Sequence, residues 1–169
     1  MSVRGREWLA ALEGGHRLQA YRDSGGVPTI GPGLTYYPIA GTRIRMGDTI
    51  TRVQSSRLFG LVLQSFEALV DSVTRDDLAQ HECDALVAFT YNIGSAFKGS
   101  TLLRRVNEHA PAAAVRAQFI RWKYDETDPD HPGLEEVPGL LRRRELEAEV
   151  YAGGPYVDQA GAVIPEPSV

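Results

Sequence analysis

Cysteine and long apolar runs are nearly absent from this sequence, and each absence excludes a class of protein. Cys83 is the only cysteine, so no disulfide can form within the chain, and no set of Cys and His has the spacing of metal ligands. No apolar run approaches the roughly 20 residues that span a bilayer, and the N-terminal segment lacks the apolar core of a signal peptide. We therefore expect folding in a reducing cytoplasm without metal, cofactor or stable membrane association.

The sequence also lacks an excess of basic residues over acidic ones. The 18 Lys and Arg residues against 22 Asp and Glu residues give a formal net charge of -4 at pH 7. Arginine is concentrated in residues 1–60, whereas acidic side chains dominate residues 124–169. Because nucleic-acid backbones are bound by clustered Lys and Arg, the acidic C-terminal part argues against a nucleic-acid partner, while the basic first third is suited to an anionic polymer.

The apolar residues that are present follow helical spacing over most of the chain. At 169 residues and 43% apolar content, the sequence fits one domain that buries about two-thirds of its extended surface. Helix starts are marked by Ser2 and Ser100 as N-caps, by Thr51 with Gln54 as a capping box, and by Pro111 in a first turn. The pattern predicts helices over residues 2–13, 51–73, 76–92, 100–106, 111–122 and 139–151.

Three segments fall outside these helices. Residues 21–45 are rich in Gly, Pro, Thr and Tyr and contain the turn signal Asp23-Ser24-Gly25-Gly26, which predicts a small β-hairpin or meander. Residues 124–137 predict an acidic loop, either solvated or a contact surface. Residues 153–169 predict a Gly- and Pro-containing tail that is loosely held. The whole chain is therefore expected to be mostly helical with a small sheet near its N-terminus.

Glu13 is the first candidate for chemistry. It follows Leu9 by one helical turn, so its carboxylate continues the apolar stripe of the first helix. A carboxylic acid kept protonated near neutral pH by apolar surroundings can act as a general acid. Taken alone, a solvated glutamate at a helix end explains the same position, so the interpretation needs support from neighbouring residues.

Asp23 and Thr29 are candidates for the residues that act with Glu13. An aspartate at the start of a turn usually bonds its own backbone, but Asp23 also has the place of a second carboxylate presented on a loop opposite Glu13. Thr29 fits a strand by its β-propensity, and its hydroxyl can also hold a water molecule. Each of these residues is weak evidence by itself.

Together with their neighbours, the three residues resemble a known signature. Glu13-Gly14, Arg17–Asp23 and Thr29–Gly33 are similar to the E-G, R-L, Y, D and T-I-G-x-G pattern of the phage-type lysozymes, glycoside hydrolase family 24. The resemblance continues in family order as far as Tyr151 and leaves out only the tail after it. The further matches are the central core helix (80–94, QHECDALVAFTYNIG), the S-T-L-L-x-x-x-N segment (97–107) and the closing G-L-x-x-R-R-x-x-E helix (139–147).

The resemblance implies the α+β lysozyme-like fold, which is mostly helical and has a small N-terminal sheet and two lobes around a cleft. One domain would span residues 1–152, followed by the tail 153–169. The small lobe would lie at about 14–50, the long connecting helix at 51–73, and the helical lobe at about 75–152 together with the helix 2–13.

The resemblance also implies a muramidase that hydrolyses the β-1,4 bond between N-acetylmuramic acid and N-acetylglucosamine in peptidoglycan. In that family Glu13 would be the proton donor, Asp23 the second catalytic carboxylate and Thr29 the water-orienting residue, with inversion at the sugar carbon. Further substrate contacts are expected from Tyr21, Gly33, Thr35, Asn92 and Arg144.

Some of these positions have structural alternatives. Asn92 also fits a helix C-cap beside Gly94. Arg143 and Arg144 are adjacent, so one is expected to anchor the closing helix by a salt bridge and the other to face the cleft or solvent. Cys83 is expected to be a buried apolar filler on the core helix.

The chain departs from the family pattern in three places. One extra residue lies between Glu13 and Asp23, which a small bulge can absorb but which leaves the stereochemical outcome open. Leu34 replaces the histidine that commonly follows T-I-G-x-G, which puts a local ion pair in doubt. The acidic stretch 124–136 is longer than the family needs. His16, close to Glu13, is expected to be partly exposed and incidental rather than a base.

Two other functions remain open at this point. A lytic transglycosylase would form an anhydro-sugar without a second carboxylate, so Asp23 and Thr29 argue against it. A peptidoglycan-binding module could keep the same fold without turnover. For phage-type lysis, the resemblance implies an enzyme made in the host or bacterial cytoplasm that reaches the wall in the periplasm after a holin-type membrane-lesion protein acts. A prophage enzyme or a bacterial effector would share the chemistry. We expect the chain to be a monomer.

Overall fold

The computed structural model describes residues 1–125 and 135–166. Six α-helices and one 3-10 helix make up most of it: α1 (Val3–Leu12), α2 (Arg52–Val73), α3 (Gln80–Ile93), η1 (Gly94–Gly99), α4 (Thr101–Asn107), α5 (Ala112–Ile120) and α6 (Pro138–Tyr151). Two antiparallel pairs complete it, β1 (Arg17–Arg22) with β2 (Pro28–Gly31) and β3 (Tyr124–Asp125) with β4 (Glu135–Glu136). The predicted combination of helices with a small N-terminal sheet is confirmed.

The predicted N-caps explain where most helices begin. The Ser2 hydroxyl accepts a hydrogen bond from the Gly5 backbone N–H at 2.9 Å, and Thr51 forms the complete capping box with Gln54. The core helix begins at Gln80 instead of residue 76, so that boundary was wrong. Its N-cap is Ala79, which makes no side-chain cap bond, and the carboxylate of Glu82 in the first turn accepts the Ala79 N–H at 2.8 Å.

The small sheet is shorter than the segment predicted for it. β1 pairs with β2 in the register Tyr21↔Thr29, with an irregularity between Arg17 and Tyr21. The remainder of the small lobe is held by isolated bridges, including Tyr36↔Arg43. The hairpin was therefore correctly predicted, but it begins at Arg17 because the chain turns immediately after α1.

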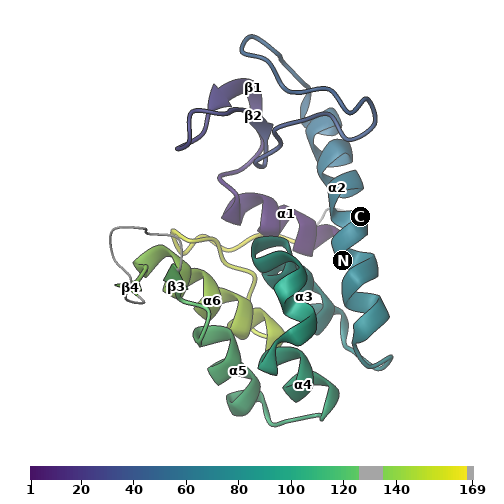
Figure 1. Ribbon diagram of the computed structural model, residues 1–169, viewed down its shortest axis with the longest axis vertical. Coiled ribbons are helices and arrows are strands. Elements are labelled where there is room, and N and C mark those ends of the chain that lie inside the picture. Colours follow the sequence, from purple (N-terminus) through teal and green to yellow (C-terminus); the bar gives the residue numbers. More distant parts are fainter. Residues whose placement is uncertain (126–134, 167–169) are drawn as a thin grey trace.

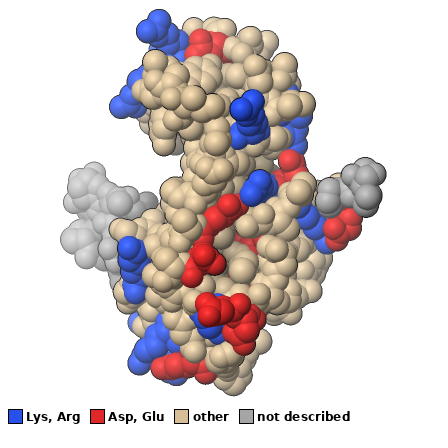
Figure 2. Space-filling view, turned by 90° about the vertical axis from the view of Figure 1, so that its right-hand side faces the viewer, with Lys and Arg blue, Asp and Glu red and all other residues tan. Residues whose placement is uncertain are grey.

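The elements form two lobes (Figure 1). β1 and β2 lie in the upper lobe, α3 to α6 gather in the lower lobe, α1 crosses between them, and α2 runs down one side. Figure 2 shows the molecule narrowing and hollowed between the lobes. Every residue from Asp84 to Thr90 in α3 is buried, so this helix forms the centre of the lower lobe. The Phe89 ring meets Phe97 and Phe119 edge-to-face at 6.2 and 5.2 Å.

The chain after α6 is docked, so the expectation of a loosely held tail is wrong for the described residues up to 166. Tyr156 is buried and its hydroxyl donates to the Asp84 carboxylate at 2.8 Å. The Trp8 indole N–H donates to the Val157 carbonyl at 2.9 Å. Asp84 is 0% exposed, and a buried carboxylate needs such donors to offset its lost hydration. Residues 167–169 lie outside the described part.

The predicted acidic loop is only partly described. Tyr124 pairs with Glu136 and Asp125 with Glu135 in the antiparallel pair β3–β4, and residues 126–134 lie outside the described residues. Within the described ranges, no helix is long and apolar enough to cross a membrane.

Candidate active site

Glu13 is fixed at the end of α1, between the two lobes. Its backbone N–H donates to the Leu9 carbonyl at 3.1 Å, so Glu13 closes the last turn. Gly14 and Gly15 follow with φ angles of 85° and 83°, a conformation that side-chain-bearing residues rarely adopt. Because Leu9 is fully buried, α1 cannot easily shift, and the Glu13 side chain, 20% exposed, has a defined position.

Arg143 is the principal partner of Glu13. The Arg143 Nη1 atom lies 2.7 Å from Glu13 Oε1, and its Nε atom lies 3.1 Å from the carboxylate of Glu147, which is 0% exposed. Burial alone would lower the pKa of Arg143, but Glu147 and Glu13 together raise it, so the guanidinium keeps its charge. The surroundings of Glu13 are therefore not purely apolar, as was expected, because a buried cation contacts its carboxylate. Sequence reasoning missed this contact.

Arg144 cannot touch substrate as predicted, because it is 0% exposed. Its Nη2 atom donates to Asn92 Oδ1 at 2.6 Å, its Nε atom lies 3.2 Å from Glu147, and the guanidinium lies over the Phe89 ring at 4.9 Å. Arg144 therefore supports Asn92 instead of contacting substrate as predicted, and Asn92 itself is exposed. Neither arginine faces solvent; of the pair, Arg143 reaches Glu13 between the lobes, and both arginines pair with Glu147.

Asp23 and Thr29 are held by the β1–β2 turn. The Asp23 Oδ1 atom accepts the Val27 N–H at 2.8 Å, as expected for an aspartate that stabilises a turn. Thr29 is 2% exposed, and its hydroxyl donates to the Val27 carbonyl at 2.9 Å. Both side chains are thus rigidly placed by backbone bonds, which is compatible with their predicted chemical roles but does not test them.

Tyr21 connects the two predicted carboxylates. Burial raises the pKa of its hydroxyl, and the negative charges of Asp23 and Glu13 act in the same direction while Arg17 opposes them. The Arg17 guanidinium lies over the Tyr21 ring at 4.2 Å. Tyr21 therefore lies within electrostatic reach of both Glu13 and Asp23.

Gly33 of the small lobe lies near the Glu13 carboxylate. Its φ angle is 78°, and a Cβ placed there would stand 3.9 Å from Glu13 Oε2 and 3.9 Å from the Tyr91 hydroxyl. A Cβ would make ordinary van der Waals contact with both atoms, so the positive φ angle is what favours glycine here. Tyr91, in the predicted core-helix match, was not named in advance as a site residue. Thr35 is half-buried in the small lobe, where its carbonyl accepts the Ile44 N–H at 3.0 Å.

The His16 residue is partly exposed, as predicted, but its ring makes structural contacts that the sequence did not indicate. Its side chain is 8% exposed, its Nδ1 atom lies 2.7 Å from the buried Ser55 hydroxyl of α2, and its Nε2 atom lies 3.6 Å from the Glu7 carboxylate. Burial and the positive charge of Arg52 lower the pKa of His16, while Glu7 opposes them. The residue therefore joins the α1–β1 connection to α2. Leu34, at the position of the missing histidine, is a core residue at 4% exposure.

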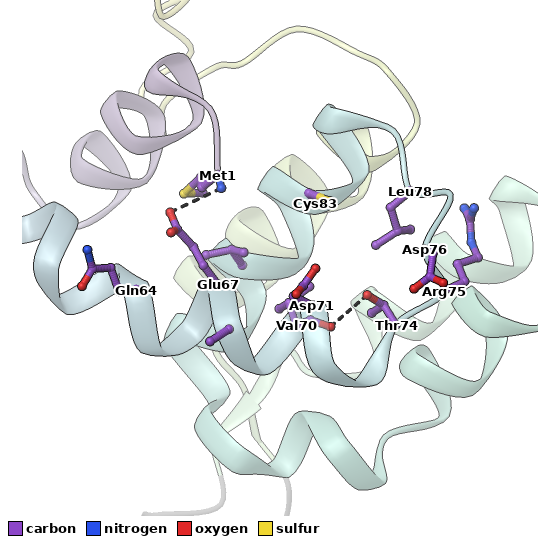
Figure 3. Close-up of a pocket in the computed structure, with 12 residues that line it drawn as sticks. Met1, Gln64, Glu67, Val70, Asp71, Thr74, Arg75, Asp76, Leu78 and Cys83 are labelled. Atoms are coloured by element: carbon purple, nitrogen blue, oxygen red, sulfur yellow. Dashed lines mark hydrogen bonds and ion pairs between the residues drawn. The ribbon is translucent and has the colours of Figure 1, made fainter.

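A cavity between α2 and α3 lies apart from these residues. It has a volume of about 360 Å³ and an acidic wall that includes Glu67 and Asp71, with Glu67 paired to the Met1 amino group at 3.3 Å (Figure 3). Cys83 lines this cavity and is half-buried, so the prediction of a buried apolar filler is only partly correct. Across the described ranges, no group of three or more His, Cys, Asp or Glu side chains is arranged to hold a metal ion.

Comparison with known proteins places this geometry in a family. The profile of the Phage lysozyme family matches residues 11–147. The endolysin of Salmonella phage P22 is 45% identical over 140 residues, which cover 82% of this chain and 89% of that protein.

Two solved structures share the fold. An endolysin from Escherichia coli O157:H7 phage FAHEc1 superposes with a TM-score of 0.79 at 33% identity, covering 89% of this chain and 91% of the other. The muramidase domain of SpmX from Asticaccaulis excentricus gives 0.74 at 30% identity, covering 89% and 95%. The predicted lysozyme-like fold is thereby confirmed, and the chain belongs to the phage lysozyme family.

Proposed function

We propose that this chain is a muramidase that cleaves the glycan strands of bacterial peptidoglycan in phage-type lysis, with Glu13 as its general acid. The observation that carries the proposal is the position of Glu13 between the lobes, paired with buried Arg143 and bordered by the open backbone of Gly33. Family membership supports the glycoside hydrolase class.

In the proposed reaction Glu13 protonates the oxygen of the bond between N-acetylmuramic acid and N-acetylglucosamine as it leaves. Asp23 and the Thr29 hydroxyl direct a water molecule to the sugar carbon. Arg143 is a positioning residue, since its contact at 2.7 Å fixes the Glu13 carboxylate without reaching substrate itself. Tyr21, Gly33, Thr35 and Asn92 are the proposed substrate contacts.

The stereochemical outcome depends on the separation of the two carboxyl groups. Inversion requires room for a water molecule, about 6.5 to 9.5 Å, against about 5 to 5.5 Å for a covalent intermediate. The Asp23 carboxylate is held in the β1–β2 turn by the Val27 N–H, and the family resemblance implies inversion. We infer inversion, and a product whose first anomer is retained would contradict it.

The proposal extends to the setting in which the enzyme acts. A monomer synthesised in the cytoplasm would reach the wall only after a holin-type protein opens the membrane. Expression of the chain alone should therefore leave cells intact until their membrane is permeabilised, and spontaneous lysis without a partner would contradict this dependence.

The decisive experiment compares the wild type with Glu13→Gln on purified peptidoglycan, with folding matched by circular dichroism. Reducing-end muropeptides from the wild type and none from Glu13→Gln are expected. Anhydro-products would identify a lytic transglycosylase. Wall binding without any released fragment would identify a non-catalytic binding module.

A further inference from the structure

The connection between β2 and α2 carries the most exposed apolar side chains of the small lobe. Ile39 is 72% exposed, Met46 is 50% exposed and Tyr36 is 47% exposed. Backbone hydrogen bonds of 2.8 to 3.0 Å close residues 35–44 into a turn, with Ile39 near its tip. Figure 1 shows this part of the chain at the end of the upper lobe, away from α3 to α6. We call residues 35–46 the outer turn.

The outer turn also carries positive charge that no neighbouring acid opposes. Arg43 pairs with Tyr36 in an antiparallel bridge, so the two side chains lie on the same face. Ile44 is only 3% exposed, whereas Arg43 and Arg45 on either side of it are exposed, as expected when side chains alternate along an extended chain. The only acid in the connection between β2 and α2 is Asp48, which is half-buried and accepts the Arg45 N–H at 3.0 Å. The outer turn is therefore both apolar and cationic.

The charge of the remaining surface gives this end of the molecule a preferred orientation. The chain as a whole has a formal net charge of -4, yet Figure 2 shows Lys and Arg on the upper lobe and most of the visible Asp and Glu surface below it. An extended anionic surface attracts the upper lobe and repels the acidic part of the lower lobe. Such a surface therefore meets the outer turn first.

We propose that the outer turn docks reversibly on a bilayer that contains anionic phospholipid. The Arg43 and Arg45 guanidinium groups pair with the lipid phosphates, while Ile39 and Met46 enter the boundary between headgroups and acyl chains. The Tyr36 ring is amphipathic and suits the headgroup level. A glycan strand is a poorer occupant, because sugars are held in concave sites by directed hydrogen bonds and gain little from aliphatic side chains on a protruding turn. This membrane contact is a second function that does not depend on the proposed muramidase activity.

The test measures flotation of the full chain with vesicles of phosphatidylglycerol and phosphatidylcholine in equal parts, and with vesicles of phosphatidylcholine alone. Binding to the anionic vesicles at low salt should be at least about tenfold tighter than to the neutral ones. Arg43→Gln with Arg45→Gln should weaken binding to the anionic vesicles about 25-fold, since each arginine near such a surface contributes about fivefold. Arg104→Gln with Arg121→Gln removes two exposed charges from the lower lobe and is the matched control, which should bind like the wild type.

The apolar part of the contact is tested separately. Ile39→Ser with Met46→Ser should weaken vesicle binding about tenfold, because less apolar surface leaves water, and should leave hydrolysis of purified peptidoglycan unchanged. Val163→Ser, at a position 62% exposed on the segment after α6, is the control and should bind like the wild type. Tryptophan placed by Ile39→Trp should shift its emission to shorter wavelength when anionic vesicles are added, whereas Val163→Trp should show no shift.

Three results would overturn the proposal. The first is equal binding to neutral and anionic vesicles, or equal binding by the wild type and Arg43→Gln with Arg45→Gln. The second is unchanged binding by Ile39→Ser with Met46→Ser, or no emission shift in Ile39→Trp, because either result means that the apolar side chains do not reach lipid. The third is an equal loss of binding to purified peptidoglycan in Ile39→Ser with Met46→Ser, because the outer turn would then serve the wall instead of a membrane.

Discussion

At the scale of the residue, the ion pair between Glu13 and Arg143 has the clearest consequence for activity. The Arg143 guanidinium bridges Glu13 at 2.7 Å and Glu147 at 3.1 Å, and only a planar fork can hold both carboxylates in this geometry. Lysine would keep the charge but bind as a single point. Arg143→Lys should therefore misplace Glu13 and lower kcat about 10²-fold, with a smaller effect on KM.

The same substitution tests whether the effect is local. Arg142→Lys, at an exposed position that pairs with Glu145 at 3.8 Å, is the control and should keep full activity. Reducing-sugar release and urea denaturation of both variants separate catalysis from folding. Full activity in Arg143→Lys would show that Glu13 needs no guanidinium to hold it.

His16 predicts a pH dependence of stability. Its pKa is lowered by burial and by Arg52, and the groups that face it are Glu7 on α1 and Arg52, Ser55 and Phe59 on α2. The folded pKa lies below the ordinary value of 6.5, so the unfolded chain binds more protons between the two values. The stabilisation by neutral His16 is thus present above about pH 6.5 and is lost as pH falls through the folded pKa.

His16→Gln can keep a contact with Ser55 without titrating. Urea unfolding at about pH 7.5 and about pH 5 should show that the wild type loses more stability on acidification than this variant. His109→Gln, whose parent side chain is 61% exposed, is the control and should follow the wild type. Parallel losses in wild type and His16→Gln would exclude His16 as the titrating group.

The proposed site residues could be named from the sequence more easily than their contacts. Glu13, Asp23 and Thr29 lie in a recognisable local pattern, and all three are on or beside the elements expected of them. Arg143 and Arg144 are adjacent on α6, and their directions depend on Glu13 and Asn92, which are distant in sequence. No local pattern encodes which of two adjacent arginines meets a partner supplied by another helix.

At the scale of the element, local signals predicted helix starts better than they predicted the ends of the chain. The capping box of Thr51 acts within one turn, so the sequence contains all of it. The docking of Tyr156 depends on Asp84, which is buried on α3. The composition of the segment after α6, taken alone, predicted a loose tail. Tertiary burial of a carboxylate is what converts this segment into part of the fold.

Tyr156→Phe should show what that docking contributes. Removing the hydroxyl leaves buried Asp84 with one fewer donor, which should cost about 1 to 3 kcal/mol of unfolding free energy and lower Tm by several degrees. Muramidase activity at low temperature should be retained, because Tyr156 packs on Trp8 at 5.5 Å and not on the catalytic residues. Val163→Ala, 62% exposed, is the thermal-unfolding control. Equal Tm values for Tyr156→Phe and the wild type would refute the role of this bond.

At the scale of the whole molecule, the small lobe exposes more positive than negative charge, which the composition alone indicated only in part. In residues 14–50 of the small lobe, Arg17, Arg22, Arg43 and Arg45 are exposed, whereas Asp23 and Asp48 are half-buried. Figure 2 shows Lys and Arg side chains on the upper lobe. An anionic polymer would therefore meet positive charge on this side of the space between the lobes, an attraction that salt screens.

This division predicts a salt-dependent KM that belongs to the small lobe. Between low salt and about 0.15 M, where the Debye length is about 8 Å, KM on peptidoglycan should rise while kcat stays nearly constant. Arg43→Gln with Arg45→Gln should raise KM at low salt and flatten its salt dependence, because the exposed charges that salt would screen are already gone. Arg104→Gln, exposed on the lower lobe, should keep the wild-type salt dependence. A flat wild-type response would mean that the glycan is held by uncharged contacts. Equal effects of the two sets of variants would mean that the charges responsible are not confined to the small lobe.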